Sequence, residues 1–246
     1  MTTSALGRVA VIGATRGLGR GVAIALAKQG WSVTAIGRTA GPLAELGIHG
    51  IEPRVGDATD ATLAREMMSE GLDAFVLVAG AQPLLAPIAS YDWEAFRRPF
   101  EVDVRAAFTW LQAALLAETP PSRAIVFSSG AALHGSPLSG GYAGAKHTQR
   151  FLCRYSQQEA KGRDLALRVQ CVLPQLNPNT TLGQAAIQAY ADKAGVSPEA
   201  FVAKRFGDSP LDPAKAGAAI VELLGTDTHA ASDELLLTGG GVRSLK

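Results

Sequence analysis

The sequence predicts a doubly wound parallel α/β sheet that forms one domain, and three observations lead to this prediction. Short, continuous apolar runs such as residues 9–12 and 74–78 are typical of strands that are covered on both faces. Segments with helical periodicity separate these runs, so strand and helix alternate from end to end. At 246 residues with 47% hydrophobic content, the chain can bury a sizeable core within a single domain.

The predicted strands recur along the whole chain. Each is a short run of aliphatic and aromatic residues, and most of them end at glycine, proline or serine. Strands are expected over residues 9–12, 32–36, 51–55, 74–78, 124–127, 168–173 and 234–237.

Helical periodicity fills most of the segments between these strands. Asp60 is a suitable N-cap for the first turn of one helix, and Asp212 with Pro213 begins another. The glycine-rich segment 41–50 is expected to hold at most a short helix around residues 43–46. Longer helices are expected around residues 22–27, 61–69, 101–117 (after Pro99, with helical periodicity beginning at about residue 93), 142–161 and 213–224.

The stretch between residues 175 and 212 breaks the alternation. It is polar and irregular, with several prolines and a helical piece near residues 185–193. So long a stretch in a compact domain is typical of a lid or a binding loop. The sequence therefore predicts one catalytic domain over residues 1–246, with a substrate loop at about 175–212.

Charge and cysteine content exclude several classes of function. The formal net charge is +1 without a basic block, so nothing indicates nucleic acid or an anionic membrane as a partner. Cys153 and Cys171 have neither metal-ligand nor redox-pair spacing, and both are expected to be buried thiols in a reducing compartment. Because we expect no signal peptide, membrane-spanning stretch or metal site, the sequence predicts a cytoplasmic protein.

A glycine turn follows the first predicted strand. Residues 13–19, Gly-Ala-Thr-Arg-Gly-Leu-Gly, lead from that strand directly into a helix. This arrangement points backbone N–H groups and the positive end of the helix dipole at a phosphate, and glycine allows the backbone to approach it closely. The alternative is a tight strand–helix turn that binds no ligand. The position after the first strand favours a dinucleotide site.

Two arginines indicate which dinucleotide is bound. The second predicted strand closes with Gly37 and Arg38, where an acidic residue would favour NAD. Arg16 lies within the glycine turn and is able to reach the same 2′-phosphate. Either arginine alone is typical of a solvated surface charge. Together, on adjacent loops, Arg16 and Arg38 favour NADP.

A serine, a tyrosine and a lysine form the candidate catalytic set. Tyr142 and Lys146 are one helical turn apart, so the phenol and the ammonium project from the same face. A nearby ammonium stabilises the phenolate and moves the tyrosine pKa toward neutrality. Ser129, just past a strand, offers a hydroxyl to a substrate oxygen. Taken alone, the Tyr–Lys pair is equally an ordinary helix-surface pair.

Together these residues resemble the short-chain dehydrogenase/reductase family, over nearly the whole chain. The match comprises its cofactor glycines, an acidic residue for the adenine, most of an Asn-Ala-Gly segment, and its Ser–Tyr–Lys set in order and spacing: Gly13, Gly17, Gly19, Asp57, Ala79, Gly80, Ser129, Tyr142 and Lys146. The resemblance implies a Rossmann-type fold. It also implies a cofactor site made of Gly13, Thr15, Arg16, Gly17, Leu18, Gly19, Arg38, Asp57, Ala58, Ala79, Gly80, Tyr142, Lys146 and Pro174.

Three positions depart from the family pattern. Val78 replaces an asparagine, at the expected cost of one loop hydrogen bond, and Gln175 replaces a glycine near the nicotinamide. Asp103 replaces the family's catalytic asparagine, and we include it among the candidate catalytic residues. Its charge is expected to stabilise the Lys146 ammonium and to offset the effect of that ammonium on Tyr142. Alternatively, Asp103 caps a helix or pairs with Arg105.

The leading hypothesis is an NADPH-dependent oxidoreductase that reduces a carbonyl to an alcohol, or the reverse. The alternatives are a cofactor-binding sensor or structural protein with a degraded catalytic set, and a non-redox isomerase or dehydratase on the same scaffold. The expected partners are a small carbonyl or alcohol substrate and, by family habit, further copies of the chain packed through the long helices. Residues 82–87, 134–139 and 175–212 are expected to line a pocket for an apolar or neutral compound.

Overall fold

The computed structural model describes residues 5–206, 209–227 and 232–245. Within them, eight strands form one sheet in the order β3-β2-β1-β4-β5-β6-β7-β8. Some predictions extend over residues 1–4, 207–208, 228–231 and 246. Those parts of the predictions lie outside the described residues. The strands are β1 (Arg8–Ile12), β2 (Ser32–Gly37), β3 (Glu52–Val55), β4 (Ala74–Leu77), β5 (Arg123–Phe127), β6 (Arg168–Pro174), β7 (Glu234–Thr238) and β8 (Gly241–Ser244).

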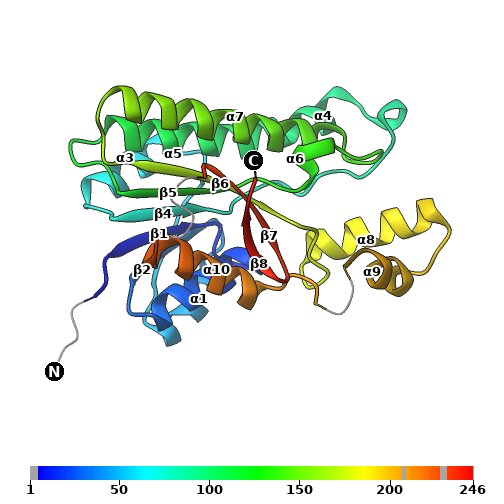
Figure 1. Ribbon diagram of the computed structural model, residues 1–246, viewed down its shortest axis with the longest axis horizontal. Helices are drawn as coiled ribbons and strands as arrows, with labels where there is room; N and C mark the ends of the chain where they lie inside the picture. The colour runs from blue at the N-terminus through cyan, green and yellow to red at the C-terminus, as the bar shows by residue number, and fades with distance from the viewer. Residues whose placement is uncertain (1–4, 207–208, 228–231, 246) are drawn as a thin grey trace.

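Helices cover both faces of this sheet, as Figure 1 shows. On one face lie α1 (Gly17–Lys28) and α10 (Pro213–Gly225), and the buried cluster beneath them includes Val22 and Ile220. On the other face lie α3 (Ala61–Ser69), α5 (Arg105–Leu116) and α7 (Gly140–Gly162), over a cluster that includes Trp110 and Cys153. The predicted doubly wound α/β fold is therefore confirmed.

The edge strand β8 is a strand that the sequence reading missed. It pairs antiparallel with β7, from Leu235 opposite Ser244 to Thr238 opposite Gly241, whereas every other described strand pair is parallel. None of its residues is buried. A strand that lacks a buried face has no apolar run from which to recognise it.

The segment around Pro99 differs from the single helix expected over residues 101–117. Helix α4 (Trp93–Pro99) continues without a break into a π-helical turn, η3 (Phe100–Val104), and then into α5. A proline inside a helix removes one N–H from the ladder, and π-turns are a known way to absorb such a disruption. Asp103 lies within this π-turn, so the turn determines the direction in which its side chain points.

The stretch 175–212 is more regular than expected. The helical piece predicted near residues 185–193 is present as α8 (Thr181–Ala194), and a second helix that was not predicted follows it, α9 (Pro198–Phe206). Thr180 caps α8 by accepting a hydrogen bond from the Gly183 N–H at 3.1 Å. In Figure 1 the two helices project beyond the sheet, on the side where β6 ends. A second expected loop, between β5 and α7, also contains a short helix, α6 (Ala131–His134).

Helix α2 (Ala40–Ala44) and the 3-10 turn η1 (Glu45–His49) occupy the segment in which a short helix was expected, and a second 3-10 turn, η2 (Ile88–Ser90), precedes α4. The predicted caps are present. Asp60 accepts hydrogen bonds from the N–H groups of Thr62 at 2.8 Å and Leu63 at 3.4 Å, and Asp212 accepts one from Lys215 at 2.8 Å.

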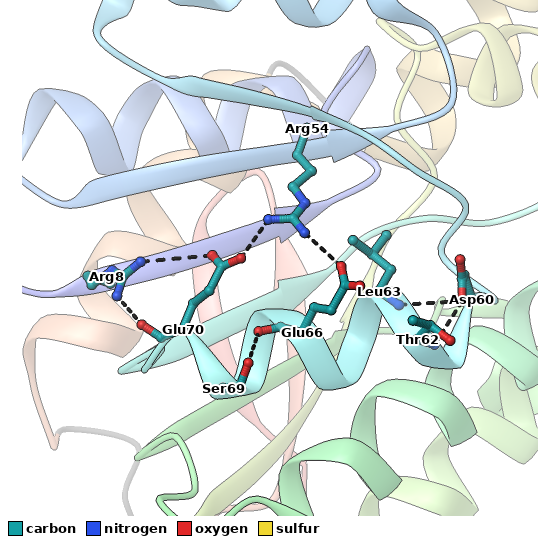
Figure 2. Close-up of polar contacts among 8 residues, drawn as sticks. All are labelled: Arg8, Arg54, Asp60, Thr62, Leu63, Glu66, Ser69 and Glu70. Carbon is teal, nitrogen blue, oxygen red and sulfur yellow. Dashed lines mark hydrogen bonds and ion pairs between the residues drawn. The ribbon is translucent and has the colours of Figure 1, made fainter.

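An ion-pair cluster, shown in Figure 2, ties the edge of the sheet to α3. Arg54 on β3 contacts Glu70 at 2.6 Å and Glu66 at 2.8 Å, and Arg8 on β1 lies 3.9 Å from the Glu70 carboxylate. Exposed pairs of this kind add little stability individually. Here they hold the outermost parallel strand, which contains Pro53, against the body of the fold. Among the described helices, none is both long and apolar enough to span a membrane.

Candidate active site

One cavity of about 1010 Å³ lies at the carboxyl ends of the parallel strands. Its lining includes every residue that the sequence reading assigned to the cofactor and to catalysis, from Gly13 on the β1–α1 turn to Pro174 at the end of β6. In open α/β sheets this edge is the usual position for a ligand. Within residues 5–206, 209–227 and 232–245, no cluster of three or more metal-ligating side chains occurs.

The β1–α1 turn leaves no room for a side chain at Gly13 or at Gly19. A Cβ on Gly19 would lie 2.2 Å from the Gly13 carbonyl oxygen, and a Cβ on Gly13 would lie 2.5 Å from the Ala79 nitrogen. Gly13 also has a φ of +93°, which residues with a Cβ rarely adopt. The turn is therefore a tight backbone cradle at the mouth of the cavity.

The N-terminus of α1 fits an anionic group. Its N-cap, Arg16, is extended with φ at −158° and makes no side-chain capping bond within the described chain. The first turn also contains no acidic residue. Uncapped N–H groups at the positive end of a helix are a suitable site for phosphate oxygens. The cradle thus fits the pyrophosphate of a dinucleotide.

Arg16 and Arg38 both line this part of the cavity with exposed side chains. Asp57 lines it as well, but its Oδ1 accepts hydrogen bonds from the Thr59 N–H and Oγ1, each at 2.8 Å. The bond from the Thr59 backbone, and to a lesser degree the charge on Arg38, hold the Asp57 pKa below its ordinary value. Asp57 therefore stays ionised and braces its own turn, within reach of Arg38.

Ser129 and Tyr142 meet at the inner wall. Ser129 follows β5, and its Oγ accepts a hydrogen bond from the Ala131 N–H at 3.2 Å. Tyr142 lies in the first turn of α7. Burial raises the pKa of the Tyr142 phenol above its ordinary value, and the nearby Asp103 charge adds to this increase. The Lys146 charge and a hydrogen bond with Ser129 oppose it without reversing it. The sequence predicted that the Lys146 charge would lower the Tyr142 pKa. Burial raises that pKa by more than the Lys146 charge lowers it.

Lys146 is buried, and three oxygens surround its Nζ. They are the Phe127 carbonyl at 3.2 Å, the Gln149 Oε1 at 3.0 Å and the Asp103 Oδ2 at 3.0 Å. Desolvation lowers the pKa of the Lys146 ammonium, but the Asp103 and Tyr142 charges raise it by more, and the net shift is upward. The Nζ lies 5.6 Å from the centre of the Tyr142 ring. The ammonium therefore acts on the phenol as a charge at a distance.

Asp103 points into the site from the π-turn η3, and its side chain is completely buried. Besides contacting Lys146, it accepts a hydrogen bond at Oδ1 from the Ala81 N–H at 2.7 Å. The alternative partner, Arg105, is exposed on α5. The bond to Ala81 holds the loop after β4, the same loop in which Val78 replaces the family's asparagine. The carboxylate thus supplies an anchor to that loop from a neighbouring element.

Gln149 is a site residue that the sequence reading missed. It lies one turn after Lys146 on α7 and is completely buried. Its Oε1 accepts from Lys146, and its Nε2 donates to the Asp103 backbone carbonyl at 2.9 Å. The i, i+3 spacing from Lys146 was the available signal, because it places Gln149 on the face of the helix that carries the lysine.

Tyr190 on α8 is a second missed residue. It lines the cavity, and its hydroxyl bonds to Ser136 on the loop before α7. Nothing near it in sequence indicates this contact, which joins residues 54 positions apart. At Gln175, where a glycine was expected, the backbone N–H donates to the Leu237 carbonyl at 2.8 Å, so the strand pairing continues past Pro174.

Comparison with known proteins identifies the family. A model described as "short chain dehydrogenase" matches residues 8–190. The chain belongs to the short-chain dehydrogenase/reductase family. This match covers the glycine turn, Asp103, Ser129, Tyr142 and Lys146, and it ends at Tyr190.

Individual relatives within the family share limited identity with this chain. D-erythrulose reductase from Gallus gallus is 38% identical over 102 residues, which are 40% of this chain and 42% of that protein. The curated relatives are matched over 42–60% of their own length. Solved structures show the fold. NAD+-bound xylitol dehydrogenase superposes with a TM-score of 0.83 at 20% identity, over 97% of this chain and 100% of that one. An actinorhodin polyketide ketoreductase with NADPH gives 0.81 at 21% identity, over 98% of each chain.

Proposed function

We propose that this chain is an NADPH-dependent oxidoreductase that interconverts a carbonyl and an alcohol. One observation carries the proposal: a single cavity joins an uncapped, glycine-lined helix N-terminus to the hydroxyl groups of Ser129 and Tyr142, which both line it. The first feature fits a dinucleotide, and the second supplies a proton donor beside an oxygen-binding hydroxyl. Family membership and reductases among the relatives support the same reaction class.

The residues divide the work as follows. NADPH, when bound, supplies the hydride. Ser129 holds the substrate oxygen and stabilises the negative charge that develops on it. Tyr142 donates its phenolic proton to that oxygen. Lys146 keeps the phenol in a positive field, and Asp103 with Gln149 fixes the position of the ammonium.

The protonation state of Tyr142 sets the pH dependence of the two directions. Because burial raises the pKa of its phenol, the group remains protonated at neutral pH and is ready to donate. Alcohol oxidation needs the phenolate as a base, so that direction requires higher pH.

The preference for NADP rests on charge. The 2′-phosphate adds up to two negative charges, and Arg16 and Arg38 lie exposed at the same end of the cavity. Asp57 is ionised nearby, but the Thr59 N–H and hydroxyl engage its Oδ1. One of the solved structures with this fold is bound to NAD+ and another contains NADPH, so the fold itself does not favour one cofactor.

The test is NADPH consumption, followed by absorbance, with a panel of ketones and aldehydes. Tyr142→Phe removes only the hydroxyl, so it should lower kcat by about 100-fold or more and leave NADPH affinity nearly unchanged. A variant that reduces its substrate at the natural rate contradicts the mechanism. NADPH binding without turnover of any carbonyl would favour the sensor alternative, and a cofactor-independent conversion of an alcohol would favour the dehydratase or isomerase.

The same proposal extends to the assembly and location of the protein. We infer one catalytic domain over residues 1–246, in which residues 175–212 form the substrate loop. We infer that the protein acts in the cytoplasm, where the buried thiols of Cys153 and Cys171 stay reduced.

We also infer a homo-oligomer formed through α5 and α7. These helices expose Phe108, Leu116, Phe151 and Tyr155, the last two stacked at 5.7 Å. Light scattering that gives the mass of a single chain would exclude the oligomer.

A further inference from the structure

The cavity has an outer chamber beyond Tyr142, enclosed by segments that lie far apart in sequence. The loop after β4 meets the loop before α7 where the Ala86 N–H donates to the Leu138 carbonyl at 3.2 Å. Helix α8 joins that second loop through the contact between the Tyr190 and Ser136 hydroxyls. The apolar lining of the outer chamber consists of Leu85, Leu133, Leu182, Tyr190, Phe201 and Phe206.

Tyr190 organises this chamber. Its hydroxyl bonds to Ser136, and its ring stacks on Phe201 of α9, with the ring centres 6.1 Å apart and the planes inclined by 14°. Tyr190 and Tyr142 line the same cavity. The stacked rings of Tyr190 and Phe201 therefore form an aromatic part of the wall of the cavity that holds the candidate proton donor.

Three hydroxyl groups of the chamber bond to each other or to the backbone. Ser136 Oγ and the Tyr190 hydroxyl form one pair. Ser139 Oγ accepts from the Ser136 N–H and donates to the Ser136 carbonyl, both at 3.0 Å. The Arg205 guanidinium lies over the Phe206 ring, 6.0 Å from its centre. The Ser136, Ser139 and Tyr190 hydroxyls already have protein partners, so they are less available to the hydroxyl groups of a substrate.

We propose that the outer chamber binds the aromatic ring of a carbonyl compound, with the ring against Tyr190 and Phe201 and the carbonyl oxygen at Ser129 and Tyr142. Aromatic rings gain both from burial and from edge or offset contacts with other rings. This inference rests on the proposed function and names its substrate class. It differs from the sugar named by the matched reductase of Gallus gallus.

The first experiment measures binding, so that it does not depend on turnover. Calorimetry on the Tyr142→Phe protein saturated with NADPH compares acetophenone, cyclohexyl methyl ketone and D-erythrulose. We expect acetophenone to bind at least about tenfold more tightly than D-erythrulose and about threefold more tightly than the saturated ring. D-erythrulose binding as tightly as acetophenone would overturn the proposal, and so would equal affinity for the two ring compounds.

The second experiment changes the wall. Phe201→Leu keeps an apolar side chain but removes the ring, and should weaken acetophenone binding about threefold to tenfold without affecting D-erythrulose or NADPH. Val202→Ala is the matched control, since Val202 is the next residue of α9 and does not line the cavity. Equal effects of the two variants would overturn the proposal. If acetophenone binds as expected and no carbonyl is reduced by the natural protein, the proposed function fails while the chamber assignment stands.

Discussion

The two ends of the cavity are built from different parts of the chain. The cofactor end is made of backbone: a glycine turn, an uncapped helix N-terminus and the ends of adjacent strands. The substrate end is made of side chains, and its contacts join α7 to η3 and α8 to the loop before α7. Backbone sites follow directly from fold and glycine spacing, whereas side-chain sites depend on partners that only the tertiary structure brings together.

This comparison predicts that small changes at the cofactor end have large effects. Gly19→Ala places a Cβ 2.2 Å from the Gly13 carbonyl oxygen, so the turn must open. We expect the free energy of unfolding to fall by about 3 kcal/mol, and NADPH affinity to fall by about 100-fold, which corresponds to ~2.7 kcal/mol. Chemical denaturation and cofactor titration measure the two effects.

Gly41→Ala is the matched control, because a Cβ at that helical position meets nothing within 4 Å. It should keep full NADPH affinity and match or exceed the stability of the natural protein. If Gly19→Ala behaved in the same way, the backbone cradle would not be the cofactor site.

A charge change at the same end should alter the choice of cofactor. Arg38→Asp turns an attraction for the 2′-phosphate into a repulsion, so NADPH affinity should fall by about 10- to 100-fold while NADH affinity changes little. Arg65→Asp makes the same charge change on the exposed side of α3, outside the cavity, and should leave both affinities unchanged. Equal affinity of the natural protein for the two cofactors would remove the basis for NADP.

At the other end, the effect of Asp103 should be read from pH dependence. Its negative charge raises the Tyr142 pKa, so Asp103→Asn should lower that pKa and move the basic limb of alcohol oxidation to lower pH. Glu94→Gln removes the same charge from an exposed position of α4 that does not line the cavity, and it should leave the profile in place. An unmoved limb in Asp103→Asn would mean that the carboxylate acts only on the fold.

The smallest expected effect is the change in the Tyr142 pKa when Gln149 is replaced. Two substitutions of similar size should shift that pKa in opposite directions. Gln149→Glu adds a second carboxylate beside Lys146 and should raise the Tyr142 pKa. Gln149→Met removes one acceptor of the ammonium, frees an N–H to turn toward the phenol and should lower that pKa. Both shifts should be smaller than the shift caused by Asp103→Asn, because Gln149 is uncharged in the natural protein.

The measurement for Gln149 is the tyrosinate absorbance of each variant, from which the same variant carrying Tyr142→Phe is subtracted. This readout does not require the protein to be an enzyme. Shifts of the same sign, or no shift in either variant, would show that Gln149 serves packing alone.

The sequence was informative where local pattern decides the structure. Buried parallel strands are apolar runs, and the helix caps at Asp60 and Asp212 are short-range features, so these predictions are confirmed. The edge strand β8 lacks a buried face, and helix α9 has no buried residue, so neither carries the apolar pattern that reveals an element. The predicted roles of Ser129, Tyr142 and Lys146 remain predictions.

The site residues that the sequence did not reveal depend on distant partners. In the sequence, Gln149 lies on a polar helix and is typical of a solvated side chain. Its role follows only from the packing of η3 against α7, which brings the Asp103 carbonyl to its Nε2. Tyr190 acquires its role from Ser136, 54 positions away, and from the stack on Phe201 of the next helix. Only the tertiary structure shows that these contacts exist.

The π-turn at Phe100–Val104 makes the site sensitive to chain length as well as to side-chain identity. A π-turn holds one residue more than the α-helical turn it replaces, and each residue of an α-helix advances by about 100°. Deleting one residue between Pro99 and Asp103 would allow a regular helix through this region. The rotation would carry the carboxylate away from Lys146 and from the Ala81 N–H together. Within this family, a gap of one residue at this place in an alignment would therefore mark chains that have lost the buried ion pair, even where they retain an aspartate.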